Sequence, residues 1–258
     1  MKKKHILFTV LLCLTVVTSV IFSGCTEEKK AEKKEIAFKM KLSEATEVRE
    51  GENPIDKLVA DGYKLENIPK DYYFRDAIFI GDSRTQGLMM FSTMKNATFY
   101  ADKGMSTVGA FKKAAIPKDG KLVTIADALK AGDYGKLYIS LGINELGYPN
   151  PDKFIERYAE LVDIAKKSNP KAKIFVQGIL PVSANKSASG STINNEKIME
   201  YNNKLLAMAR DKKVEYINVG ESVADQTGAL AQEGSWDGVH LNKEYCLKWE
   251  KYIMEHMV

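Results

Sequence analysis

From residue 77 to the C-terminus, short apolar runs alternate with longer amphipathic segments, and this alternation constrains the fold more than any other feature. We expect strands at 77–80, 97–101, 136–141, 173–179 and 215–219, and helices at 85–91, 108–113, 122–129, 152–167, 194–211 and 242–257. Strands separated by helices form a parallel sheet with right-handed crossovers and helices on both faces. The chain is therefore predicted to contain one three-layer α/β/α domain, at residues 53–258.

The first predicted strand stops at Gly81-Asp82-Ser83, and a helix-like pattern follows it. A serine at such a turn lies at the carboxyl edge of the sheet, where open α/β folds place their chemistry. Its backbone N–H also lies at a helix N-terminus, which suits a developing oxyanion. Ser83 is thus a candidate nucleophile, and its alternative role is that of a helix N-cap.

Two downstream motifs could supply partners for Ser83. Gly142-Ile143-Asn144 follows the apolar run 137–141, and Asp237-Gly238-Val239-His240 precedes the last predicted helix. A serine hydroxyl needs a base to take its proton, and the base needs a third group to fix its tautomer. An aspartate three residues before a histidine can bind imidazole Nδ1 while Nε2 faces the serine. An asparagine at a neighbouring strand end can donate to an oxyanion.

Plainer interpretations of these residues remain open at this point. Asn144 could serve a β-turn, and Asp237 could cap the last helix or form an Asx turn. The histidine base is better defined, because the chain has three histidines. His5 lies in the N-terminal targeting segment and His256 is two residues from the C-terminus, so His240 is the better candidate.

Together these motifs resemble those of the SGNH, or GDSL-type, esterase family, from about residue 73 onward. The resemblance implies Ser83 as nucleophile, His240 as base and Asp237 as its orienting partner. It implies an oxyanion hole of the Ser83 N–H, the Gly104 N–H and the Asn144 amide. Gly109, close to Gly104 in sequence, is the alternative glycine for this position. Glu145 stands where the family usually has aspartate. The resemblance also implies a five-stranded sheet of flavodoxin-like order 2-1-3-4-5.

Motifs for other chemistries are missing from the sequence. It contains no Gly-x-Ser-x-Gly elbow, no His-Glu-x-x-His, no cysteine pair at zinc spacing and no phosphate-binding glycine fingerprint. We therefore expect neither a cofactor nor a metal.

The N-terminus has the pattern of a secretory signal. Met1-Lys2-Lys3-Lys4 is positively charged, residues 6–22 are apolar, and Ser23-Gly24 precedes Cys25. This resembles a bacterial lipoprotein signal with Phe22 in place of the usual aliphatic residue, and it implies that residues 1–24 are removed and Cys25 is lipidated. Residues 25–52 would tether the domain to the outer face of the membrane. Plain secretion and an uncleaved anchor are the alternatives.

Removal of residues 1–24 changes the charge balance, and the use of cysteine agrees with export. The chain has 38 basic and 34 acidic residues; residues 1–24 hold three lysines and no acid, which leaves 35 against 34. So small an excess gives no case for nucleic-acid binding. Cys13 leaves with the signal and Cys25 takes lipid, so Cys246 is expected to be a small buried residue. The charged tether could form a transient helix, and residues 36–42 could add an edge strand.

The motifs, the resemblance and the N-terminal signal together imply an extracytoplasmic serine esterase. That it removes small acyl groups, acetyl in particular, from a carbohydrate or cell-envelope substrate is what its location and the family resemblance imply. An acyltransferase to glycan would use the same residues, and a non-catalytic ligand-binding lipoprotein is the alternative of another class. Arg84 could contact an anionic or sugar group, or lie exposed in the first helical turn. The polar segment 182–193 could border the substrate or form a mobile surface loop. No oligomeric state is predicted.

Overall fold

The computed structural model describes residues 29–30, 32–39, 41, 54–64 and 67–256, and it divides the chain into two units, Met1–Pro69 and Lys70–Val258. The predicted signal peptide and Cys25 lie outside the described residues. Residues 54–69, predicted to begin the hydrolase domain, fall in the first unit.

In the first unit, the described residues between 29 and 41 are helical, as is α2 (Pro54–Ala60). The alternative of an edge strand at 36–42 is therefore wrong for the described residues of that range, 36–39 and 41. Glu35 and Lys39, one helical turn apart, form an ion pair at 2.7 Å. Pairs of this spacing and order favour a helix over an extended segment.

The second unit is built on one parallel sheet. Its strands are β1 (Ala77–Gly81), β2 (Thr98–Ala101), β5 (Lys136–Ser140), β6 (Lys173–Gln177) and β7 (Glu215–Ile217). They lie in the order β2-β1-β5-β6-β7, and all neighbouring pairs are parallel. The predicted strands and the flavodoxin-like order are confirmed, with small shifts at the strand ends. β1 consequently ends between the ends of β2 and β5.

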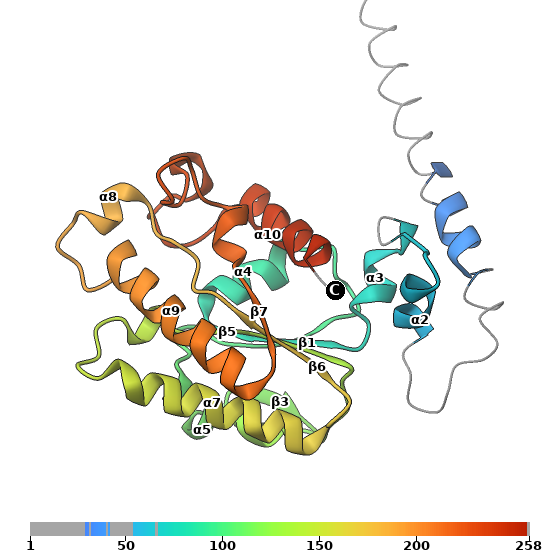
Figure 1. Cartoon of the computed structure of the whole chain (residues 1–258), viewed down its shortest axis with the longest axis horizontal. Coiled ribbons are helices and arrows are strands. Elements are labelled where there is room, and N and C mark those ends of the chain that lie inside the picture. Colours follow the sequence, from blue (N-terminus) through green and yellow to red (C-terminus); the bar gives the residue numbers. More distant parts are fainter. Residues whose placement is uncertain (1–28, 31, 40, 42–53, 65–66, 257–258) are drawn as a thin grey trace, which may run out of the picture. The chain divides into compact units, whose positions relative to one another are not determined.

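Helices cover both faces of this sheet (Figure 1). α4 (Ser83–Phe91) and α10 (Lys243–Glu255) pack together on one face. The other face carries α5 (Thr107–Lys112), α6 (Ile125–Leu129), α7 (Pro151–Ser168) and α9 (Asn195–Lys212). The predicted three-layer α/β/α architecture is confirmed.

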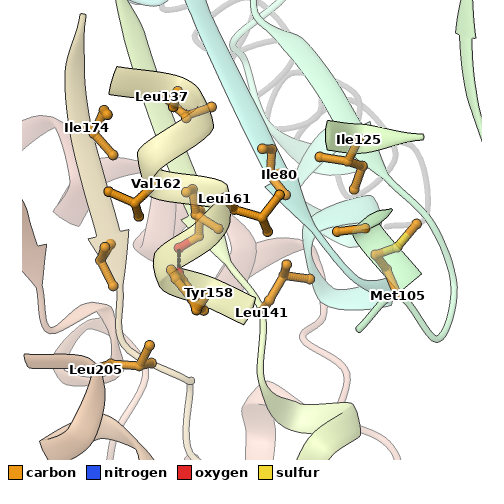
Figure 2. Packing of buried hydrophobic residues seen from close by; sticks show 14 of the residues in the cluster. Ile80, Met105, Ile125, Leu137, Leu141, Tyr158, Leu161, Val162, Ile174 and Leu205 are labelled. Atoms are coloured by element: carbon orange, nitrogen blue, oxygen red, sulfur yellow. Dashed lines mark hydrogen bonds between the residues drawn. The ribbon is translucent and has the colours of Figure 1, made fainter. Parts of the chain in front are cut away.

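The two faces of the sheet have different cores. Under α7, aliphatic side chains such as Ile80, Leu137 and Ile174 meet Leu161 and Val162 (Figure 2). On the opposite face one aromatic ring from each of four neighbouring strands forms a row: Phe99, Phe79, Tyr138 and Phe175, with adjacent centroids 4.6–5.0 Å apart. Strand register places these rings opposite one another, and their stacking resists slippage between strands.

The predicted helix at 122–129 starts too early, because a small hairpin precedes it. β3 (Ile116–Lys118) pairs antiparallel with β4 (Lys121–Val123). Asp119 and Gly120 between them have φ values of 49° and 75°. A two-residue turn with both φ angles positive is the type I′ hairpin turn, for which Asp-Gly is a typical sequence. That dipeptide was the signal for the hairpin.

The shorter elements include α3 (Lys70–Tyr73), α8 (Ala184–Ser187) and the 3₁₀ helices η2 (Ile143–Glu145), η3 (Val219–Ser222) and η4 (Gln232–Gly234).

Cys246 of α10 is a free thiol and fully buried, as expected, and burial raises its pKa to about 12. Among the described residues, no helix is both long and apolar enough to span a bilayer.

Candidate active site

Ser83 is the first residue of α4, and only Asp82 separates it from strand β1. Asp82 is the N-cap of this helix, and its Oδ1 accepts the Arg84 N–H at 2.9 Å. Gly81 has to be glycine here, since a Cβ would collide with the Thr85 side chain and with the Ser140 carbonyl of β5. The tight packing of α4 against β1 and β5 therefore fixes Ser83 at the carboxyl edge of the sheet.

The structure brings Ser83, His240 and Asp237 together in one hydrogen-bonded chain. Ser83 Oγ lies 2.9 Å from His240 Nε2, and His240 Nδ1 lies 2.6 Å from Asp237 Oδ2. Ser83 and His240 are 157 residues apart in sequence. Catalysis by a serine nucleophile requires this order of contacts, in which the aspartate binds the imidazole nitrogen that does not face the serine.

The Asp237 carboxylate has its two oxygens in different roles. Oδ2 faces the His240 ring, while Oδ1 accepts the backbone N–H groups of Val239 at 2.9 Å and His240 at 2.8 Å. Partial burial by itself would raise the pKa of Asp237, but the hydrogen bonds from the His240 ring and these two N–H groups outweigh it. They hold the pKa of Asp237 well below its ordinary value, so this carboxylate is charged at neutral pH.

The loop that carries Asp237 and His240 is held by the segment 182–193. Ser183 caps α8 and donates its backbone N–H to the Gly238 carbonyl at 2.9 Å. Gly238 has a φ of +77°, and a Cβ there would meet the Ser183 side chain. Part of this polar segment is thus a short helix packed against the Asp237–His240 loop.

Asn144 and Gly104 lie at the ends of the strands that flank β1. Asn144 is in η2, just after β5, and donates one amide hydrogen from Nδ2 to the Met105 carbonyl at 2.8 Å. Gly104 has a φ of +69° in a turn closed by the Met105 N–H on the Asp102 carbonyl at 3.0 Å. Within residues 67–256 the Gly104 N–H has no hydrogen-bond partner, whereas that of Gly109 binds Ser106 Oγ.

Arg84 occupies neither of its two predicted positions. Its side chain is 3% exposed, and Nη1 donates to the Leu180 carbonyl at 2.9 Å. Nε lies 3.9 Å from Asp82 Oδ1, and Asp82 is also buried. Burial lowers the pKa of Arg84 and raises that of Asp82. In each case the opposite charge of the other residue partly opposes this shift. Arg84 is therefore a structural residue beneath the site and does not face a substrate.

Glu145 is a buried acid that sequence reasoning treated only as a departure from the family pattern. Its side chain is fully buried, and Oε1 accepts the Thr107 N–H at 2.5 Å. Burial raises the pKa of Glu145 to about 7, although the Thr107 hydrogen bond opposes the shift. Through this hydrogen bond the Glu145 side chain links the η2 turn to the first residue of α5.

This raised pKa predicts a pH-dependent stability. The folded protein keeps the Glu145 proton at pH values where the unfolded chain, with a pKa of 4.5, has lost it. The contribution of Glu145 to stability is therefore full below pH 4.5 and decreases as the pH rises to 7, by up to about 3 kcal/mol. Glu145→Gln cannot titrate, so its free energy of unfolding should rise relative to the original protein between pH 5 and 7.5. Urea unfolding at both pH values measures this, and parallel changes in the two proteins would contradict it.

Within the described ranges, no three His, Cys, Asp or Glu side chains are grouped so that they could hold a metal ion. The structure brings Ser83, His240 and Asp237 into contact with one another, and it places Gly104 and Asn144 at the ends of the two strands that flank β1.

Several solved structures share this fold. A protein from Streptococcus pneumonia matches with a TM-score of 0.57 at 20% identity, over 80% of this chain and 99% of that one. A GDSL-like lipase from Bacteroides thetaiotaomicron VPI-5482 matches with a TM-score of 0.54 at 17% identity, over 78% of this chain and 95% of that one. An acetylxylan esterase from Geobacillus stearothermophilus matches with a TM-score of 0.51 at 14% identity, over 69% of this chain and 92% of that one. Identities this low demonstrate a shared fold alone.

The sequence itself gives the more specific match. No match was found among curated proteins. The model of the GDSL-like Lipase/Acylhydrolase family matches residues 79–244, which include Ser83, Asn144, Asp237 and His240. The chain belongs to the GDSL-like lipase/acylhydrolase family and is an enzyme that hydrolyses ester bonds.

Proposed function

We propose that this enzyme removes small acyl groups, acetyl in the first place, from an acylated carbohydrate outside the cytoplasm. The observation that carries the catalytic part is the hydrogen-bonded chain from Ser83 Oγ through the His240 ring to Asp237 Oδ2. It contains a nucleophile, a base in contact with it and a charged group that fixes the base.

In the proposed reaction, Ser83 Oγ attacks the ester carbonyl carbon and gives its proton to His240 Nε2. The resulting oxyanion accepts hydrogen bonds from the N–H groups of Ser83 and Gly104 and from the second amide hydrogen of Asn144. The bond between the carbonyl carbon and the sugar oxygen then breaks, and His240 gives the proton to that departing oxygen, which leaves as a hydroxyl group. A water molecule, deprotonated by His240, releases the acid from the acylated Ser83.

Hydrolysis is favoured over acyl transfer by the openness of the site. The side chains of His240 and Asp237 are 50% and 54% exposed. Water therefore has direct access to an acyl-enzyme, whereas a transferase has to keep water away from it.

The carbohydrate part of the proposal has two supports. Acetylxylan esterases are among the structures with this fold. In addition, Trp236, the residue before Asp237, is 96% exposed. An indole ring held in water on the loop that carries the base offers a flat apolar face of the kind that stacks on a sugar ring.

Activity measurements on the full-length protein in detergent test the proposal. We expect it to hydrolyse p-nitrophenyl acetate faster than longer p-nitrophenyl esters, to release acetate from acetylated xylo-oligosaccharides, and to be labelled by a fluorophosphonate at Ser83. Ser83→Ala should abolish both turnover and labelling. Absence of turnover and of label in the original protein would refute the esterase mechanism. Transfer of acetyl to an added oligosaccharide in excess of acetate release would favour the acyltransferase.

A contribution of Trp236 to sugar binding can be measured separately. Trp236→Ala should raise KM for acetylated xylo-oligosaccharides by roughly 2- to 13-fold, the range expected for loss of one stacking contact of about 0.5–1.5 kcal/mol. The kinetics with p-nitrophenyl acetate should stay nearly unchanged, because that ester carries no sugar. An equal effect on both esters would argue against the stacking role.

The location outside the cytoplasm rests on the N-terminal pattern that ends in Ser23-Gly24-Cys25. Because lipid attachment requires the thiol, Cys25→Ser should be found in the medium or as an unprocessed precursor. Mass spectrometry of the N-terminal peptide from the original protein should find Cys25 diacylated at the N-terminus of the chain. An unmodified Cys25 would leave secretion or an uncleaved anchor as explanations.

A further inference from the structure

Two consecutive residues of the η2 turn hold the same loop, the segment 102–106 between β2 and α5. Asn144 Nδ2 donates to the Met105 carbonyl at 2.8 Å, and Glu145 Oε1 accepts the Thr107 N–H at 2.5 Å. The two hydrogen bonds are made on either side of Ser106, so the η2 turn binds the end of this loop at two points. Gly104, the proposed second oxyanion donor, is in the loop directly before them.

Glu145 is itself immobilised on several sides. Its carbonyl accepts the Tyr201 hydroxyl of α9 at 3.0 Å and the Tyr148 N–H at 2.8 Å, and its own N–H binds the Gly142 carbonyl at 3.1 Å. The side chain is fully buried. The carboxyl group is therefore a fixed point to which the residue after the loop is hydrogen-bonded.

An oxyanion donor is useful only if it is already in place when charge develops on the substrate. The donor has to lie within about 2.7–3.1 Å of the oxyanion, and a displacement of about 1 Å can cost 10²-fold in rate. Gly104 has no side chain to pack, and its N–H makes no hydrogen bond among the described residues that would fix its direction. Its orientation has to come from the neighbours in the loop.

We propose that Glu145 is a positioning residue of the oxyanion hole, which fixes the 102–106 loop through the Thr107 N–H and thereby aims the Gly104 N–H. The inference rests on the proposed esterase function. It is the reach of the side chain that matters, since a carboxylic acid, a carboxylate and an amide oxygen can all accept an N–H. Aspartate would fall short of Thr107 by one methylene, about 1.5 Å.

The chain offers substitutions on both sides of this contact. Glu145→Gln keeps the acceptor and the length of the side chain, and should retain kcat within about 3-fold. Glu145→Asp should lower kcat by roughly 10- to 100-fold with little change in KM, because only the transition state carries the oxyanion. Thr107→Pro removes the N–H itself. Proline is favoured at the first position of a helix, and Ser106 before it is already extended (φ −123°, ψ 169°), so α5 should still form.

The experiment measures kcat and KM for p-nitrophenyl acetate, together with the rate of fluorophosphonate labelling of Ser83, in full-length variants. Glu145→Asp and Thr107→Pro should lose kcat and labelling rate in the same proportion, and the double variant should lose little more than either one, because both break one contact. If Glu145→Asp does not fold, Thr107→Pro measures the same loss.

Each other outcome overturns the inference. A Glu145→Asp or Thr107→Pro enzyme with unchanged kcat would refute positioning, and a rise of KM in place of the fall in kcat would show a role in substrate binding. Glu145→Gln as impaired as Glu145→Asp would show that charge matters and reach does not. Failure of the esterase proposal is distinguishable, since it would leave the original protein without turnover or labelling.

Discussion

Asp237→Asn is expected to lower kcat by up to about 10⁴-fold while the protein remains folded. The structure dictates how the new amide would be oriented. Two backbone N–H groups, of Val239 and His240, point at the Oδ1 position and require an oxygen there. The amide NH₂ must then face His240 Nδ1, which makes Nδ1 the acceptor and leaves the proton on Nε2. A histidine in that tautomer cannot take the proton of Ser83.

The same substitution separates this role from a structural one. As a pure turn residue, Asp237 would act only through Oδ1, and asparagine would replace it without loss. Thermal unfolding and kcat should therefore be measured on the same preparation, with rates referred to the folded fraction. A nearly normal kcat in the folded Asp237→Asn protein would exclude Asp237 as the orienting partner of His240.

His240→Ala is expected to lower kcat on the order of 10³-fold or more, with little effect on folding. The imidazole contacts Ser83 on one side and Asp237 on the other, and half of its side chain is exposed, so its removal opens no buried cavity. Without it, no group of the hydrogen-bonded chain can accept the Ser83 proton. The loss should appear equally in the rate of fluorophosphonate labelling.

His256 supplies the matched control. It lies beyond the end of α10, is exposed, and stacks on Tyr252 with ring centroids 3.7 Å apart. His256→Ala should have normal kinetics, because the hydrogen bond and the ring contact described for His256 are both with Tyr252 of its own helix. If His256→Ala were the inactive variant and His240→Ala the active one, the assignment of the base would be wrong.

The strands of the sheet could be predicted from the sequence because their signal is local. Each central strand is buried on both faces, as in Ala77–Gly81 and Lys136–Ser140, and so reads as a short run of apolar residues between turns. The amphipathic pattern of 152–167 likewise marked a helix, and Phe154, Tyr158, Leu161 and Ala165 are buried as expected. The strand order itself came from the family resemblance.

Other features depend on distant partners, and the sequence alone did not determine them. Arg84 follows the serine in a first helical turn, where side chains are usually exposed. Its side chain is buried because it contacts the Leu180 carbonyl and Asp82. The small hairpin at 116–123 was missed for another reason. Its Asp-Gly turn is a local signal, but the strands are too short to stand out from the helix that follows.

What the sequence by itself determined is the five strands of the parallel sheet, the main helices that cover it, and Ser83, Asn144, Asp237 and His240 as candidates for the site. The distances between them are a tertiary property, because Ser83 and His240 meet only when β1 and the loop before α10 reach the same edge of the sheet. The place of Glu145 was likewise decided by the fold. Its acceptor role exists only because parallel strands bring the ends of β2 and β5 to either side of β1, within reach of one glutamate side chain.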